Sequence, residues 1–192
     1  MINSYIQDIR ELLAKARQKA YTAVNSSMIE AYWQIGKRIV EQEQQGEKRA
    51  AYGEQVLKEL SKALTMEFGK GFSSSSLRNF RQFYLTYPDE QICYTLCSKL
   101  TWSHNRLIMR VNDPKARSWY LQEAVEQGWS VRALDRNIDT FYYQRLLSSK
   151  QQPKTLKDNS VLKKINPTDF VKDPYVFEFL NIPSLIIRQK GK

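Results

Sequence analysis

The sequence has few of the residues that build metal sites, disulfides and catalytic centres. It contains two cysteines and one histidine. Cys93 and Cys97 are four positions apart in an apolar stretch, a spacing typical of packing on one helix face rather than of a disulfide or a metal site. His104, the single histidine, is expected to be a polar residue in the first turn of a helix. We therefore expect no metal, no cofactor and no catalytic residue.

Long apolar runs and acidic residues are also scarce. No hydrophobic segment reaches the length of a membrane span. The first residues lack the basic-then-apolar order of a signal peptide, so a cytoplasmic protein is expected. Lys and Arg outnumber Asp and Glu by 30 to 20, and this excess favours a polyanion or an anionic membrane surface as the partner. A hydrophobic fraction of 42% is enough for a globular core.

Strand signals are nearly absent, and apolar residues recur at three- and four-residue steps, which predicts an all-α fold. Residues 3–24 carry one apolar stripe, and Ser26 or Ser27 can cap a second helix that runs to about residue 40. These two helices are expected to form an antiparallel hairpin, which could also contribute to a dimer interface. Further helices are predicted over 52–68, from the Ser73–Ser76 run to residue 87, from Thr101 or Ser103 through residue 110, over 114–127 and from Ser130 through residue 145.

Two pairs of these helices are joined by short turns in the manner of a helix-turn-helix. In the unit over residues 119–138, Ala124, Gly128 and Ser130 occupy the positions of a small contact residue, a turn glycine and an N-cap. Arg132 and Arg136 follow on one face of the second helix, where they are expected to meet a ligand. On the other side of that helix, a series that includes Leu134, Ile138, Phe141 and Arg145 is expected to face the core.

The second unit surrounds Gly69 and the four serines that follow it. No acidic residue occurs from residue 68 to residue 88. A helix that starts in an acid-free segment with a free serine cap can donate hydrogen bonds to a phosphate. Together with a basic helix start near residue 106, the two units give these expected DNA-binding residues: Lys70, Ser76, Arg78, Arg81, Arg106, Arg110, Ser130, Arg132 and Arg136. Such units also occur as plain corners in helical bundles, and the arginines could equally form a solvated face.

The character of the chain changes beyond residue 147. Residues 148–159 are polar and contain Pro153, which is typical of a linker. The aromatic segment over residues 166–180 has no evident packing partner and looks like the start of a domain that this chain lacks. We therefore divide the chain into a helical domain, 1–147, and an irregular tail, 148–192.

Several separated segments agree in order and spacing with a known family. They are residues 31–37 (AYWQIGK), 52–53 (YG), 69–73 (GKGFS), 77–84 (LRNFRQFY), 100–104 (LTWSH), 117–120 (RSWY), 126–130 (EQGWS) and 173–180 (DPYVFEFL). Over residues 1–182 the chain resembles the YhcG-like proteins, in which an all-helical N-terminal domain precedes a PD-(D/E)xK nuclease domain. The resemblance implies a nucleic-acid-binding or targeting module whose catalytic carboxylates lie downstream, beyond the end of this chain.

A false nuclease signature is present in the chain itself. Pro88-Asp89, followed by Asp113-Pro114-Lys115, has the letters of the PD-(D/E)xK motif. That chemistry needs its acidic groups and its lysine on strands, where Pro114 would remove a ladder hydrogen bond. Asp113 and Pro114 instead suit an N-cap and the first position of a helix. We therefore expect a non-catalytic protein that binds nucleic acid, most simply double-stranded DNA. The alternative is a dimerisation or interaction module that docks on a separate nuclease domain or another protein.

Overall fold

The computed structural model describes residues 2–45, 50–149 and 174–180, and every regular element in these ranges is helical. The elements are α1 (Ile2–Gln45), α2 (Ala50–Phe68), η1 (Lys70–Phe72), α3 (Ser74–Thr86), α4 (Glu90–Thr95), η2 (Cys97–Lys99), α5 (Trp102–Ile108), α6 (Pro114–Glu126), α7 (Val131–Asp139), α8 (Tyr142–Ser149) and α10 (Pro174–Phe179). The predicted all-α class is confirmed over these residues.

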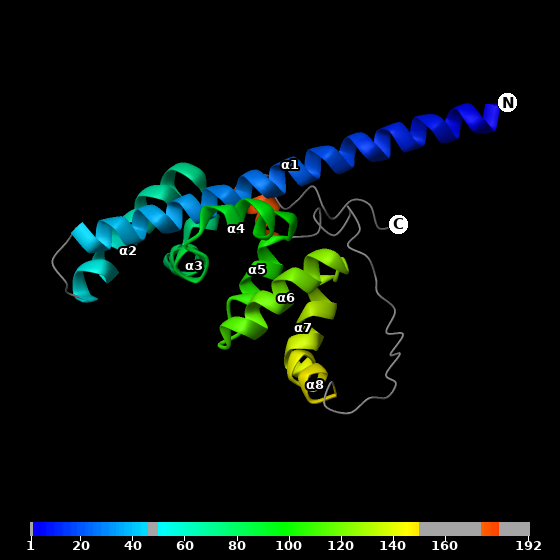
Figure 1. The fold of residues 1–192 in the computed structure, drawn as a ribbon. Coiled ribbons are helices and arrows are strands. Elements are labelled where there is room, and N and C mark those ends of the chain that lie inside the picture. The colour runs from blue at the N-terminus through cyan, green and yellow to red at the C-terminus, as the bar shows by residue number, and fades with distance from the viewer. Residues whose placement is uncertain (1, 46–49, 150–173, 181–192) are drawn as a thin grey trace.

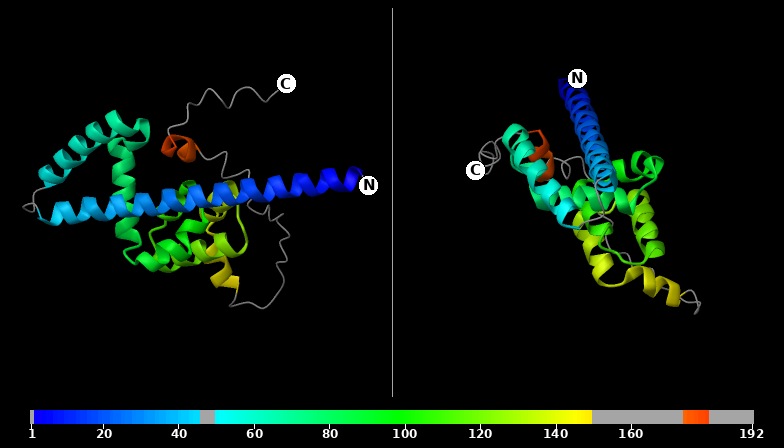
Figure 2. Two further views of the ribbon diagram at one scale, coloured as in Figure 1. Left: turned by 90° about the horizontal axis from the view of Figure 1, so that it is seen from above. Right: turned by 90° about the vertical axis from the view of Figure 1, so that its left-hand side faces the viewer.

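The long helix α1 organises the molecule. Its C-terminal half packs on α3, with α2 beside it, while α4 to α8 lie together along one side of the rod (Figure 1). The N-terminal half of α1 extends past the rest of the molecule, as the views from above and from the end show (Figure 2). None of the described helices combines the length and apolar character needed to cross a membrane.

The predicted N-terminal hairpin is wrong, because α1 continues through the point where the chain was expected to turn. Asn25, Ser26 and Ser27 lie inside the helix and cap nothing. Asn25 is buried, and its Nδ2 donates to the carbonyl oxygens of Ser98 (3.0 Å) and Leu100 (2.9 Å). The polar residues that suggested a break therefore join the middle of α1 to the segment that precedes α5.

The core is centred where α1 crosses α3. Gly36 allows the two backbones to approach, since a Cβ at this position would lie 2.1 Å from the carbonyl oxygen of Phe80. Tyr32 stacks on Phe80 with ring centroids 4.0 Å apart, and Trp102 packs its edge against Tyr32 at 5.0 Å. Trp33 donates from Nε1 to the carbonyl oxygen at the end of α3. The large aromatic residues of α1, α3 and α5 thus form one apolar interior.

Four predicted helix starts are confirmed by their capping hydrogen bonds. Ser73, from the serine run, accepts from the N–H of Ser76, and Thr101 accepts from the N–H of His104. Asp113 accepts from the N–H of Lys115 at 2.9 Å, with Pro114 in the first turn. The capping interpretation of Asp113-Pro114 is therefore correct. Ser130 accepts from the N–H of Ala133 at the start of α7.

Three other expectations are wrong. The helix predicted from Ser130 through residue 145 is interrupted, because Phe141 has φ 52° and is exposed, and α8 starts anew after it. Arg145, expected on the core side, is therefore exposed. The aromatic segment near residue 175 does have a packing partner: α10 packs on α1 and η1, Val176 is buried, and Phe179 meets Tyr32 edge-on. The tail was also predicted to start too early, because residues 148 and 149 still belong to α8, and residues 150–173 and 181–192 lie outside the described residues.

Candidate nucleic-acid interface

The turn between α6 and α7 is fixed by local hydrogen bonds. Gly128 has φ 61°, and the N–H of Trp129 reaches back to the carbonyl of Ala124 at 3.1 Å, which is the Schellman closure of a helix. Ala124 is fully buried, as expected for the small contact residue of such a unit. Ser130 then starts α7. The sequence therefore placed all three turn residues of this unit correctly.

Buried His104 holds this turn against α5. Its Nε2 lies 2.9 Å from the carbonyl oxygen of Trp129, and its Nδ1 lies 2.8 Å from the hydroxyl of Thr101 and 3.3 Å from the Thr101 N–H. A carbonyl only accepts and a backbone N–H only donates, so the neutral ring carries its proton on Nε2. His104 lies in the first turn of α5, as the sequence predicted, and its ring joins the start of α5 to the turn before α7.

Tyr120 fixes the far end of α7. Its hydroxyl donates to the carbonyl of Asn137 at 3.0 Å and accepts from the N–H of Tyr143 at 3.2 Å. Trp119 packs against Tyr142 and Tyr143 with ring centroids 5.8 and 5.5 Å away. The break between α7 and α8 is therefore fixed by hydrogen bonds and ring contacts from α6.

Arg132 and Arg136 lie on that outer face. Both are exposed, and neither side chain has an ion pair or hydrogen bond within the described part of the chain. Arg145 on α8 lies close by, since the Thr140 hydroxyl donates to the Arg136 carbonyl at 2.9 Å and lies 3.3 Å from an Arg145 guanidinium nitrogen. We call Arg132, Arg136 and Arg145 the α7–α8 basic surface. The sequence analysis did not predict Arg145 as part of this surface. It treated residues 130–145 as one helix, because no residue type indicated the positive φ at position 141.

The second predicted basic group is largely engaged by acidic residues. Arg81 donates from Nε to Glu43 at 2.6 Å, and Glu43 is well shielded, with 19% of its side chain exposed. Arg78 lies 3.8 Å from Glu54 in an exposed pair. Such pairs reduce the charge available to a polyanion. Lys70 remains exposed and without a partner among the described residues, and Ser76 serves the cap of α3.

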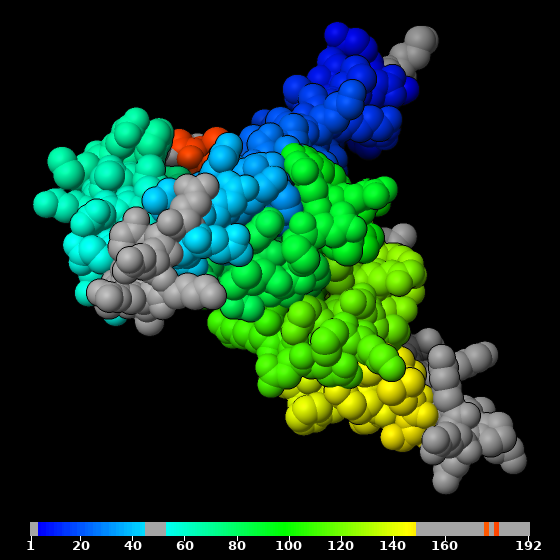
Figure 3. Space-filling view, turned by 60° about the vertical axis from the view of Figure 1, so that its left-hand side comes forward, coloured from blue at the N-terminus to red at the C-terminus, as the bar shows by residue number. Residues whose placement is uncertain are grey.

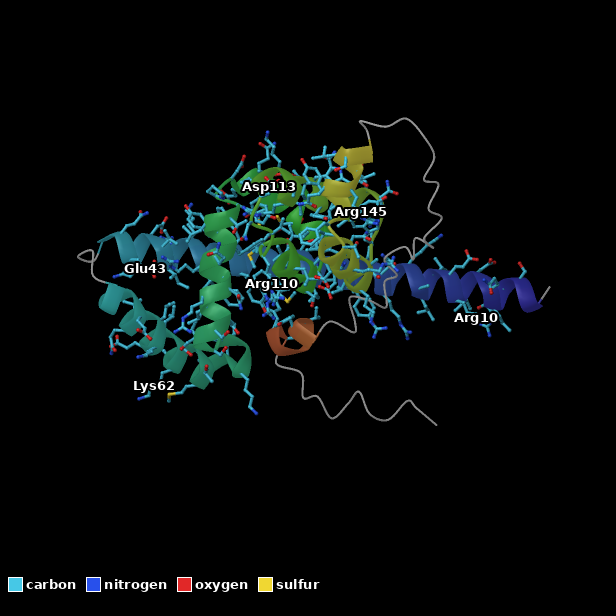
Figure 4. All side chains as sticks on the ribbon, turned by 90° about the horizontal axis from the view of Figure 1, so that it is seen from below. Arg10, Glu43, Lys62, Arg110, Asp113 and Arg145 are labelled. Atoms are coloured by element: carbon cyan, nitrogen blue, oxygen red, sulfur yellow. The ribbon has the colours of Figure 1, made fainter. Side chains whose placement is uncertain are left out.

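The third predicted basic group consists of Arg106 and Arg110, which have different surroundings. The Arg106 guanidinium lies over the ring of Tyr175 in α10, 5.3 Å from the ring centroid. Arg110 follows the end of α5 and is exposed. Figure 4 shows Arg110, Asp113 and Arg145 in the part of the molecule formed by α5 to α8, away from Glu43 and Lys62 at the other end. Of the predicted residues, Arg110, Arg132 and Arg136 are thus the exposed arginines for which no carboxylate partner is found among the described residues.

Two other features of the described residues are an apolar cleft and the distribution of possible metal ligands. An apolar cleft of about 440 Å³ lies between α1 and α2, and Arg38, the one charged residue in its lining, is paired with Glu41. Such a lining does not suit a phosphate. Within the described residues, no group of three or more His, Cys, Asp or Glu side chains could hold a metal ion.

Comparison with known proteins identifies the family to which the helical part of the chain is similar. Residues 8–145 match the family described as the DUF1016 N-terminal domain. The chain is 35% identical over 204 aligned residues to a protein named "Putative nuclease YhcG" from Escherichia coli (strain K12). The alignment covers 91% of this chain and 54% of that protein, so the chain spans about half the length of this relative. No solved structure is significantly similar.

Proposed function

The chain belongs to the DUF1016 N-terminal domain family and is YhcG-like, and from this premise we propose that it is a cytoplasmic, non-catalytic module that binds double-stranded DNA for a nuclease-associated protein. The observation that carries the proposal is the unpaired arginine pair on α7, which follows a closed Schellman turn and a serine cap. Arg132 lies in the first turn of α7 and Arg136 in its last turn, and two exposed guanidinium groups along one helix suit phosphate contacts.

The charge balance of α7 sharpens this proposal. Asp135 and Asp139 are also exposed on α7, so the helix by itself has no net charge. Affinity must therefore come from arginines placed next to the backbone of the nucleic acid, with support from Arg145 on α8. Removing one of the acidic groups should strengthen binding.

The experiment compares binding to random duplex DNA as salt is raised. Replacing Arg132 and Arg136 together by alanine should weaken binding and lower the salt slope by about 2, since each lost phosphate contact removes about one unit. The charge-matched control is the double variant of Lys58 and Lys62, two exposed residues on α2, which should keep the wild-type slope. The substitution Asp135→Asn should tighten binding.

The melting temperature should stay unchanged in all three variants, because the side chains are exposed. Equal affinity and slope in the wild type and the α7 double variant would refute the proposed interface. Preference for single strands or RNA would refute the choice of duplex DNA. Cleavage of plasmid in the presence of magnesium or manganese would refute the non-catalytic assignment.

A second candidate function is docking on a separate nuclease domain. The observation that favours it is the coverage, since the relative named as a nuclease continues well beyond the length matched by this chain. Binding to a nuclease domain that is independent of salt, without binding to duplex DNA, would favour this function over the first.

A further inference from the structure

The N-terminal part of α1 is not covered by any other part of the chain that the structure describes. Residues 4–20, which we call the arm, are all exposed. The arm nevertheless carries a row of large apolar side chains, which are Tyr5 (67% exposed), Ile6 (41%), Ile9 (38%), Leu12 (66%) and Leu13 (54%). Ala16 and Ala20 continue this row at helical spacing. Figure 3 shows the arm projecting as a rod away from the rest of the molecule.

The apolar row of the arm points away from the body of the protein. Ile9 is at the centre of the row, and Gly36 is at the centre of the buried face of α1. The two positions are 27 residues apart, which at 3.6 residues per turn is about seven and a half turns. The row and the buried face therefore lie on opposite sides of one continuous helix. The described helices to which α1 is anchored therefore cannot cover this row, and it remains available to a further surface.

We propose that a second copy of this chain covers it, through antiparallel pairing of the two arms. The first argument is the size of the side chains. The first half of the row is large, with Tyr5, Ile6 and Ile9, and its second half is small, with Ala16 and Ala20. A two-fold axis near Leu12 and Leu13 places the large half of each arm against the small half of the other, which keeps the helix separation even. Parallel pairing would place alanine opposite alanine.

The second argument is charge. Asp8, Lys15 and Lys19 lie along one edge of the row, at spacings of seven and four residues. In an antiparallel pair the same edges meet, so Asp8 of each copy faces the lysines of the other. The opposite edge carries Arg10 and Arg17, whose long side chains can extend into water and form a positive strip along the paired arms.

The area is sufficient for reversible association. Complete burial of the five large side chains on both arms would remove roughly 1,000 Å² from water, close to the 1,200 Å² at which specific interfaces begin. The row faces away from each body, so the two bodies lie at opposite ends of the pair without contact. The dimer is therefore expected to form in a concentration-dependent way, independently of nucleic acid.

The test is the mass of the 192-residue protein, without DNA, measured by sedimentation over about 1–200 μM, because the dimer fraction rises with protomer concentration. Wild type should pass from monomer to dimer. Leu12→Lys should remain a monomer, whereas the control Gln18→Lys, with the same added charge on the opposite face of the arm, should dimerise as wild type does. Neither substitution touches the core, so both variants should melt as wild type does.

Orientation is tested by single cysteines on the arm, since Cys93 and Cys97 are buried. Leu12→Cys should form a disulfide-linked dimer under mild oxidation, and Ala20→Cys should not. Efficient crosslinking through position 20 would overturn the antiparallel arrangement. A monomer at every concentration would overturn the proposal, as would binding of the arm to anionic phospholipid vesicles without self-association.

Discussion

Substitution of Gly36 by alanine tests the crossing of α1 and α3 directly. In an exposed helix this change would stabilise the protein by about 1 kcal/mol, because alanine has the higher helix propensity. Here the new Cβ would lie 2.1 Å from the Phe80 carbonyl oxygen and 3.1 Å from the Cβ of Tyr84. A backbone carbonyl cannot rotate aside, so α3 must move by about 1 Å, which loosens the stack of Tyr32 on Phe80.

Overpacking costs about 1–3 kcal/mol, and a shift of this size belongs at the upper end of that range. After the gain in propensity is subtracted, we expect a net loss of about 2 kcal/mol. For a protein of this size that corresponds to a fall in melting temperature of about 4–8 °C. The assay is urea denaturation followed by circular dichroism, with a parallel thermal melt.

Gly53→Ala in α2 is the matched control. Its Cβ would first meet Oε1 of Glu43 at 3.2 Å, and a shift of about a few tenths of an ångström relieves this contact while Oε2 keeps its bond to Arg81. This variant should be as stable as wild type or slightly more so. If Gly36→Ala were equally stable, the close approach of the two helices, and with it the packing of the core, would be refuted.

Two further predictions concern buried groups. Asn25→Ala should lower the free energy of unfolding by about 1–3 kcal/mol in urea denaturation, because it removes both donors to the buried carbonyls of Ser98 and Leu100; an unchanged midpoint would contradict the role given to Asn25. Cys93 and Cys97 should not react with a thiol reagent at pH 8 until the protein unfolds, and rapid labelling of the native protein would contradict their burial. Burial, together with Glu30 and Glu90, raises the pKa of the Cys93 thiol from 9.0 to about 12. The unfolded chain therefore loses this proton first, and stability should fall as pH rises from 9 towards 12.

Local signals predicted the starts and ends of most helices. Serine, threonine and aspartate caps, with Gly128 at the end of α6, act through hydrogen bonds to residues two to five positions away. Such bonds depend on the local sequence alone, so the fold class and the α6–α7 unit could be predicted. The break at Phe141 could not be predicted. It depends on the hydroxyl of Tyr120, which is distant in sequence and bonds to the backbone of Asn137 before the break and of Tyr143 after it.

The first 45 residues show most clearly which features depend on the local sequence and which depend on tertiary packing. The sequence by itself determined the apolar residues at helical spacing, and the polar residues Asn25, Ser26 and Ser27, read as caps, suggested two helices. Only the tertiary structure decided that the helix continues, because the stability of α1 near Asn25 comes from carbonyls of a segment more than seventy residues away. The arginines show the same difference. Their positions are known from the sequence, but whether their charge is available to a ligand depends on the carboxylates that folding brings near. Glu43 reaches Arg81 in this way, whereas Arg132 and Arg136 remain free in the described structure. Periodicity and capping are local properties, whereas burial and ion pairing are fixed by packing between distant segments.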